Sequence, residues 1–217
     1  MEKIIHQIWV GPYEMPDREK LFVNKIKENN KEYQHILWTN DNLPEFPDNF
    51  KPLWDKFEAA EDYAHQADIL RVLVLALYGG IYLDVDFDYI GSINDARFEE
   101  VNGFFCYHGG NDYTMPNGIF AASKGSDIIN FLLNSMDIQK GAWFGPSWLG
   151  DKVKEFIGLE REVEHEIVKQ RLENLNIKYL LFDFIENVYF RHHALYSWSP
   201  ENKRNFKNGN INYLWTK

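Results

Sequence analysis

The sequence predicts a single α/β domain organised around a parallel sheet. A β-rich apolar segment, an amphipathic helical segment and a second β-rich segment follow one another near the start of the chain. Later, a long apolar helix leads through two glycines into a short buried strand. This order is typical of parallel α/β units, because two parallel strands need a crossover connection between them. The length of 217 residues suits one large domain.

Strands and helices alternate through the first half of the chain. Residues 3–10 are β-rich and end at a Gly-Pro turn, residues 17–30 place apolar side chains at helical spacing among charges, and residues 33–38 are again β-rich. Three prolines in residues 43–57 favour irregular chain with one short helix near its end. A long helix is then expected over residues 59–78, and the strand 81–83 follows it.

The second half carries shorter elements, identified by the same periodicities and turn residues. They are strands at residues 103–108 and 118–122, a helix at 127–136, a helix that follows an aromatic turn and ends near 156, a charged helix at 160–174 and a strand at 177–182. The following stretch, residues 189–198, is dense in aromatic and imidazole groups.

Composition excludes several classes of protein. Apolar residues make up 45% of the chain and aromatic residues 16%, which is typical of a globular protein. The net charge of −10 argues against a nucleic-acid partner, which would need a basic surface. The single cysteine, Cys106, cannot form an intramolecular disulfide, and neither a signal peptide nor an apolar run long enough to span a bilayer is present. We therefore expect a soluble, cytoplasmic protein without a transmembrane segment.

The stretch from residue 64 to residue 88 indicates a function most strongly. Its helix is apolar all round in the later half, Gly79 and Gly80 end it, and residues 81–83 form a strand that leads into Asp84. Polar groups lie at both ends of this apolar stretch, which is costly unless they bind something.

Three carboxylates follow the strand, at Asp84, Asp86 and Asp88. Residues two apart in a strand point to the same face, so these carboxylates are expected side by side. They repel one another unless a hard divalent cation lies among them, and oxygen ligands select Mg²⁺, Mn²⁺ or Ca²⁺ over Zn²⁺. A solvated acidic turn is the alternative interpretation.

Five further side chains are candidates, each with a structural alternative. Asp68 and Arg71 share one helical face, where they form an ion pair or bind hydroxyls and a phosphate. Trp9 is either a core residue or a platform for a nucleobase at a strand end. His192 and His193 are adjacent, so at most one of them faces a given metal, and a lone histidine is often structural.

Several blocks of the sequence, in their order along the chain, resemble the DxD sugar-binding glycosyltransferases of family 32. That family includes the yeast initiating mannosyltransferase and capsule-type enzymes, and the glucosyltransferase domains of large clostridial toxins are similar in the same blocks. The blocks are His6-Gln7-Ile8-Trp9-Val10-Gly11, Leu37-Trp38-Thr39, Ala64 with Asp68-Ile69-Leu70-Arg71, Tyr78-Gly79-Gly80-Ile81-Tyr82-Leu83-Asp84-Val85-Asp86, and His193 with Ser197-Trp198.

The resemblance implies a GT-A type fold, with a Rossmann-like, nucleotide-binding mixed sheet flanked by helices in one domain. Residues 1–90 would be mainly the donor half, and residues 91–217 mainly the acceptor half and a C-terminal lid. It implies nucleotide and donor binding by Ile8, Trp9, Val10, Asp68, Arg71, Tyr82, Asp84, Asp86, Ser197 and Trp198. It also implies catalytic roles for Asp68, Arg71 and Asp86, metal ligation by Asp84, Asp86 and His192 or His193, and an acceptor side lined by Asn117 and residues 143–146.

The function implied is transfer of a hexose from a UDP- or GDP-linked donor to a glycan or protein acceptor, with Mn²⁺ or Mg²⁺ as cofactor and with retention of configuration. Two other functions remain open. Phosphatases of the haloacid dehalogenase type also place Asp-x-Asp after an apolar strand, although usually near the N-terminus. A non-catalytic carbohydrate-binding module would also use aromatic and carboxylate side chains, but it would leave Asp68, Arg71 and the metal cluster without a shared task.

Overall fold

The computed structural model describes residues 1–60, 62–93, 97–108, 114–136 and 144–193. Within them, one mixed sheet has the strand order β2-β1-β3-β6-β5-β7. Its strands are β1 (Ile4–Trp9), β2 (Gln34–Thr39), β3 (Gly80–Leu83), β5 (Gly103–Tyr107), β6 (Ile119–Ala122) and β7 (Ile177–Leu181). β1 runs parallel to β2 and β3, β6 runs antiparallel to β3 and β5, and β7 runs parallel to β5.

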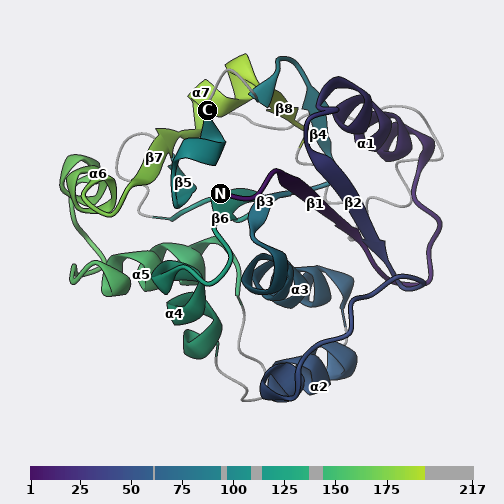
Figure 1. Cartoon of the computed structure of the whole chain (residues 1–217), viewed down its shortest axis with the longest axis horizontal. Helices are drawn as coiled ribbons and strands as arrows, with labels where there is room; N and C mark the ends of the chain where they lie inside the picture. Colours follow the sequence, from purple (N-terminus) through teal and green to yellow (C-terminus); the bar gives the residue numbers. More distant parts are fainter. Residues whose placement is uncertain (61, 94–96, 109–113, 137–143, 194–217) are drawn as a thin grey trace, which may run out of the picture.

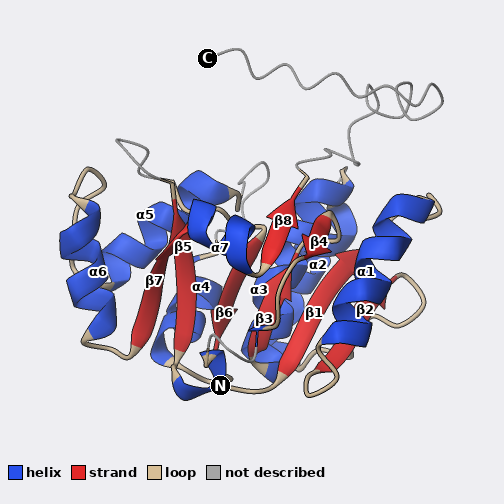
Figure 2. Ribbon diagram, turned by 90° about the horizontal axis from the view of Figure 1, so that it is seen from above, coloured by secondary structure: helices blue, strands red, loops and turns tan. Residues whose placement is uncertain are grey.

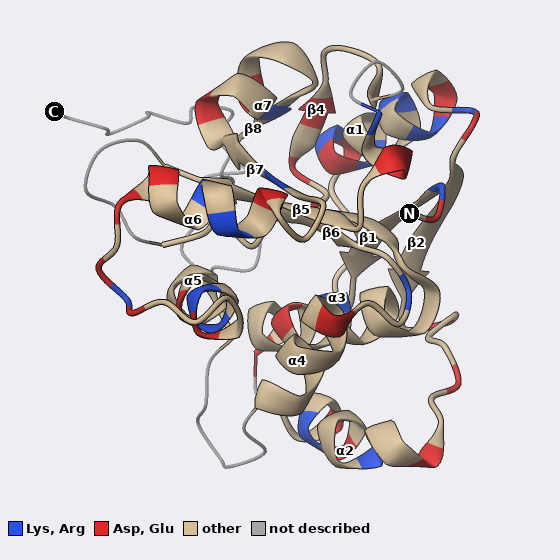
Figure 3. Ribbon diagram, turned by 60° about the vertical axis from the view of Figure 1, so that its left-hand side comes forward, with Lys and Arg blue, Asp and Glu red and all other residues tan. Residues whose placement is uncertain are grey.

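Helices cover both faces of this sheet, with α1 and α7 on one face and α2 to α5 on the other (Figures 1 and 2). They are α1 (Asp17–Asn29), α2 (Lys51–Ala59), α3 (Tyr63–Tyr78), α4 (Asp127–Ser135), α5 (Pro146–Phe156), α6 (His165–Glu173) and α7 (Phe182–Val188). Charged residues gather on the helices, whereas the strands of the sheet carry few of them (Figure 3). Among the described residues, no helix is both long enough and apolar enough to cross a membrane.

Alternating side chains of the strands fill two separate core layers. In β3, Ile81 and Leu83 join the layer beneath α7, while Tyr82 joins the layer beneath α3. In β5, Phe104 and Cys106 lie on the first face and Phe105 lies on the second. Because helices cover both faces, the central strands read as continuous apolar runs in the sequence.

The turn between α3 and β3 fixes where the polar end of the strand lies. Asp62 caps α3 by accepting a hydrogen bond from the backbone N–H of His65 at 2.7 Å. At the other end, Gly79 and Gly80 have φ values of 68° and 106°. A Cβ on Gly80 would lie 2.5 Å from the backbone oxygen of Ile4, so only glycine lets β3 pair with β1 here. The chain reverses sharply, and β3 then runs toward the edge where β1 also ends.

A second, two-stranded sheet was absent from the sequence prediction. β4 (Phe87–Tyr89) pairs antiparallel with β8 (Phe190–His192), and their register places Phe87 opposite His192. Phe87 and Phe190 are both buried beside α7, which anchors the pair. This pairing brings a segment near residue 192 to the residues that follow β3.

The short helix expected near the end of residues 43–57 is present as α2, and it is longer than expected. It begins at Lys51, because Pro52 lies in the first turn, where a helix tolerates proline. The helix expected from residue 59 starts only at Tyr63, since Ala60 is extended and Asp62 forms the cap.

Candidate metal and donor site

Asp84 and Asp86 lie in the turn that joins β3 to β4. The sequence analysis placed them on one face of a strand, but β3 ends at Leu83, and Val85 and Asp86 form a turn. Val85 is buried against Met15 and Val23. This apolar anchor fixes the turn, so the two carboxylates are brought together by the turn and not by strand alternation.

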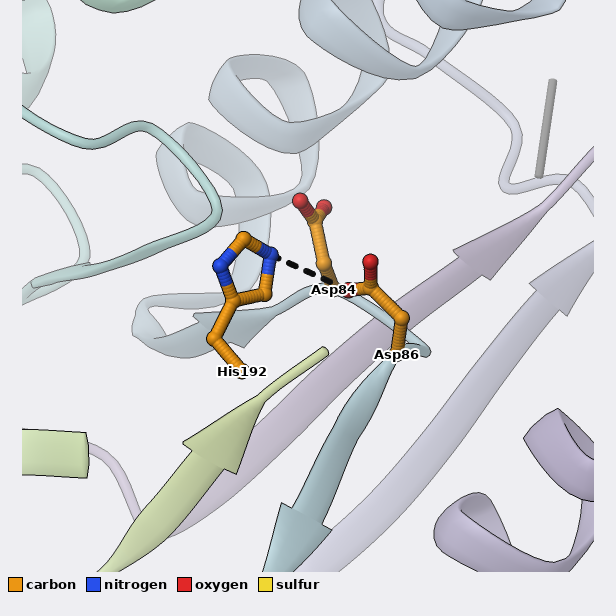
Figure 4. A group of neighbouring side chains, drawn as sticks. All are labelled: Asp84, Asp86 and His192. Atoms are coloured by element: carbon orange, nitrogen blue, oxygen red, sulfur yellow. Dashed lines mark ion pairs between the residues drawn. The ribbon is translucent and has the colours of Figure 1, made fainter. Parts of the chain in front are cut away.

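His192 completes a group of three possible metal ligands with Asp84 and Asp86 (Figure 4). One ligand atom from each side chain lies within 4.8 Å of the other two, and Nε2 of His192 is 3.4 Å from Oδ1 of Asp86. The ring of His193 instead stacks on Phe22 of α1, with centroids 4.7 Å apart. The two adjacent histidines thus point to different surroundings, as expected for an extended segment.

Burial and mutual charge perturb these groups. Burial raises the pKa of Asp84 to about 6, with Arg71 opposing the shift and Asp86 adding to it. Burial lowers the pKa of His192, but its hydrogen bond and charge interaction with Asp86 outweigh that effect, and the net pKa is raised. The two carboxylates therefore repel each other, and positive charge next to them is favourable.

Three neighbours position the Asp84 carboxylate and its backbone. Oδ1 accepts a hydrogen bond from the hydroxyl of Tyr82. A Cβ on Gly118 would lie 2.7 Å from Oδ2, so the missing side chain at position 118 leaves the space that the carboxylate occupies. The Gln7 side chain donates to the backbone oxygen of Asp84 at 3.2 Å, and His35 pairs with Gln7 at 2.8 Å.

Arg71 is buried and connects this group with α3. Its Nη2 atom lies 3.1 Å from Oδ1 of Asp68 and 3.5 Å from Oδ1 of Asp84. Its Nη1 atom donates to the backbone oxygen of Asn117 at 2.5 Å, and its guanidinium carbon lies 4.7 Å from the centre of the Tyr82 ring. A planar guanidinium can make all of these contacts at once, and a lysine cannot.

Asp68 is buried in the same network. Its Oδ1 also accepts a hydrogen bond from Nδ2 of Asn117 at 2.8 Å. Its Oδ2 lies 4.0 Å from the position of a Cβ on Gly145. Burial raises the pKa of Asp68, and the charge of Arg71 opposes that rise. Asn117, expected on the acceptor side, thus joins Asp68 and Arg71 directly.

The end of β1 contributes one partly exposed ring. Ile8 and Val10 are buried in the core, so only their backbone could contact a ligand. Trp9 is partly exposed, and its indole N–H donates to the backbone oxygen of Tyr13 at 2.8 Å. The ring of Trp9 lies at the carboxyl edge of the parallel strands, where ligands commonly bind in α/β proteins.

The remaining predicted residues fall into two groups. Asp88 lies in β4 and forms an ion pair with Lys25 of α1 at 2.9 Å, outside the group of three ligands. Ser197, Trp198 and Trp143 lie outside the described residues. Gly118 and Gln7 were missed as site residues, although Gln7 stands inside the first quoted block and Gly118 follows Asn117 directly.

The residues present fit a divalent cation. Two carboxylate oxygens suit Mg²⁺ or Mn²⁺, and an imidazole nitrogen in the set favours the transition metal Mn²⁺. The absence of a side chain at Gly118 leaves room for the Asp84 carboxylate. Together with Arg71, the arrangement can bind a strongly anionic group such as a diphosphate, while Asp68 can accept hydrogen bonds from hydroxyls.

Comparison with known proteins agrees with this geometry. A family model described as "Glycosyltransferase sugar-binding region containing DXD motif" matches residues 16–102. An uncharacterized glycosyltransferase of Acanthamoeba polyphaga mimivirus is 30% identical over 145 residues, which cover 63% of this chain and 56% of that protein. Inositol phosphoceramide mannosyltransferase 2 of Schizosaccharomyces pombe is 35% identical over 85 residues, which cover 39% of this chain and 24% of that protein. The chain therefore spans about half of the first relative and about a quarter of the second.

Among solved structures, the PaToxG glycosyltransferase superposes with a TM-score of 0.58 at 18% identity, covering 81% of this chain and 85% of that one. This likeness concerns the fold, and it confirms the expected GT-A type α/β architecture.

Proposed function

We propose that this chain is a metal-dependent glycosyltransferase of the DXD type, which transfers a hexose from a UDP- or GDP-linked donor to a glycan or protein acceptor. The match of the family model to residues 16–102 supports this proposal. The observation that carries the proposal is the group formed by Asp84, Asp86 and His192 beside the buried Arg71. If the chain were a phosphatase or a non-catalytic sugar-binding module, its match to the glycosyltransferase family model would have no explanation.

The metal ligands in this proposal are Asp84, Asp86 and His192, with Mn²⁺ as the preferred ion and Mg²⁺ as the alternative. His193 is not a ligand, because its ring stacks on Phe22. A bound divalent cation supplies positive charge next to the leaving diphosphate, whose negative charge grows as the sugar–phosphate bond breaks.

Arg71 has two tasks in this proposal. It holds Asp68 and Asp84 in place through its Nη2 atom, and its fixed positive charge favours the leaving diphosphate. Because the guanidinium is already held by the Asn117 backbone and by Tyr82, little reorganisation is needed during the reaction. Tyr82 acts by orienting Asp84 and Arg71, since it is buried and does not reach solvent.

Asp68 binds hydroxyls of the donor sugar. Its Oδ1 is engaged by Arg71 and Asn117, which leaves Oδ2, on the side of Gly145, for the sugar. The segment from 144 to 146 together with Asn117 then borders the sugar on the acceptor side. Retention of configuration by front-side attack is compatible with this arrangement, because such an attack needs no covalent nucleophile.

The nucleobase lies against Trp9 at the end of β1, with the backbone of residues 8 and 10 beside it. Ser197 and Trp198, the residues expected to form a lid, lie outside the described residues. Within one domain, residues 1–90 supply mainly the donor half, and residues 91–217 supply mainly the acceptor half and this lid. The proposed setting is the cytoplasm.

A panel of UDP- and GDP-sugars, assayed for donor hydrolysis with and without Mn²⁺, tests this function. One donor should be hydrolysed only when Mn²⁺ or Mg²⁺ is present, and Arg71→Ala should reduce that rate about 100-fold or more. Hydrolysis that is unaffected by a chelator, or no hydrolysis of any donor, would count against the proposal.

A further inference from the structure

The loop that leaves β1 is held by an asparagine side chain from the neighbouring turn. Oδ1 of Asn40 accepts a hydrogen bond from the backbone N–H of Gly11 at 3.1 Å, and Nδ2 of Asn40 donates to the backbone oxygen of Gly11 at 2.8 Å. The amide thus pairs with both polar groups of one residue, in the way that two strands pair. Because loop 10–16 has no regular structure, this pair replaces the backbone partners that it lacks.

Asn40 is itself presented by a rigid turn. Oδ1 of Asn42 accepts from the backbone N–H of Thr39 at 2.6 Å, and its Nδ2 donates to the backbone oxygen of Leu37 at 2.9 Å. The Thr39 hydroxyl accepts from the backbone N–H of Asp41 at 3.3 Å. The turn after β2 therefore has its own side-chain hydrogen bonds, and it offers Asn40 in a fixed position.

The loop is also confined by rings. Gly11 has a φ of 110°, and a Cβ there would lie 2.8 Å from the ring of Tyr63 at the start of α3. The ring of Tyr13, two residues later, packs edge-on against the ring of Tyr63, with centroids 6.1 Å apart. The backbone oxygen of Tyr13 accepts a hydrogen bond from the indole N–H of Trp9. The loop is thus fixed at Gly11 by Asn40 and Tyr63, and at Tyr13 by Trp9.

We propose that Asn40 is a positioning residue for the nucleobase: its amide pair with Gly11 holds loop 10–13 in the shape that receives the base beside Trp9. The inference rests on the proposed function, because it assumes that the base of a nucleotide lies at this strand end. Asn40 would act through the loop and not on the reacting atoms. Removal of the Asn40 amide should weaken the binding of any ligand that has a base, and it should leave the affinity for ligands without a base unchanged.

Two substitutions separate the hydrogen-bonding role from the presence of the side chain. Asn40→Ala removes both hydrogen bonds. Asn40→Asp keeps the shape and one acceptor, but it turns an oxygen toward the carbonyl of Gly11, where the amide donated before. Asn187→Ala is the matched control, because Asn187 is an exposed asparagine of α7 whose amide donates to Asp183 within its own helix.

Calorimetry with Mn²⁺ present should compare UDP, GDP and inorganic pyrophosphate as ligands, and thermal melting should confirm that each variant is folded. For whichever nucleotide the wild-type protein binds, both Asn40 variants should raise Kd about tenfold, as expected when two ordinary hydrogen bonds no longer preorganise the loop. Pyrophosphate should bind with equal affinity to the wild-type protein, the two Asn40 variants and Asn187→Ala. In turnover, the donor KM should rise while kcat changes little.

Three results would overturn the inference. Unchanged nucleotide affinity in both variants would show that the loop does not depend on Asn40. An equal loss of affinity for the nucleotide and for pyrophosphate would place the effect at the metal and not at the base. A wild-type protein that binds neither UDP, GDP nor pyrophosphate with Mn²⁺ would contradict the proposed function and this inference with it.

Discussion

Replacing His6 with glutamine gives a direct measure of how the fold depends on one neutral imidazole. His6 is fully buried in β1. Its Nε2 lies 2.8 Å from the backbone oxygen of Gly79, and its Nδ1 receives the indole N–H of Trp38 at 3.0 Å. An indole can only donate, so Nδ1 must accept, and the single proton of the ring is on Nε2. A second proton would face the N–H of Trp38.

Burial lowers the pKa of His6 from 6.5 to about 4, although the hydrogen bond to Gly79 opposes the shift. The folded pKa is below the unfolded one, so the unfolded chain binds more protons between these two values. The free energy of unfolding therefore falls as the pH falls through this window. The whole shift corresponds to about 3 kcal/mol, of which about 2 kcal/mol is lost between about pH 7.5 and about pH 5.

Urea denaturation of the wild-type protein and of His6→Gln at these two pH values isolates that contribution. Glutamine offers one donor and one acceptor but does not titrate, so the variant should lose about 2 kcal/mol less on acidification than the wild type. Other titrating groups, including the half-buried His35 whose pKa is also lowered to about 4, are present in both proteins and cancel. Equal losses in the two proteins would refute the assignment of His6 as a neutral, buried imidazole.

The remaining predictions concern the site. Arg71→Lys should lower kcat/KM about 100-fold in steady-state kinetics. The reason is that an ammonium cannot bridge Asp68 and Asp84 while it also donates to the Asn117 backbone. A variant with a kcat/KM near that of the wild type would contradict this prediction. Gly118→Ala should weaken Mn²⁺ binding about tenfold in calorimetry, because the new Cβ would displace the Asp84 carboxylate, and unchanged affinity would show that the carboxylate has room to move.

Much of the fold could be predicted from the sequence because its central elements are long or strongly periodic. β1, α1, β2 and most of α3 follow from local patterns. The pairing of β4 with β8 joins residues 87–89 to residues 190–192, and each strand is only three residues long. No periodicity can develop over three residues, and a pairing across a hundred positions leaves no local signal. α7 was missed for a similar reason, since it is one short helix that follows β7 without a loop.

The candidate site was predictable in its residue types and less so in its geometry. The blocks of the resemblance pointed to Asp68, Arg71, Asp84 and Asp86, which the structure brings together. The choice between His192 and His193 depends on the β4–β8 register, which the sequence does not display. The role of Gly118 depends on what is missing at that position, and only the packing around Asp84 reveals it.

Calorimetric titration of the protein with UDP and with GDP, with and without Mn²⁺, tests the central claim most directly. Asp86→Asn removes a proposed ligand at constant shape, and Asp88→Asn is the matched control, because Asp88 pairs with Lys25 outside the group of three ligands. We predict that Mn²⁺ tightens binding of one nucleotide about 100-fold in the wild type and in Asp88→Asn, and that this gain is lost in Asp86→Asn. Binding that is independent of Mn²⁺, or an Asp86→Asn variant that retains the full gain, would contradict the account.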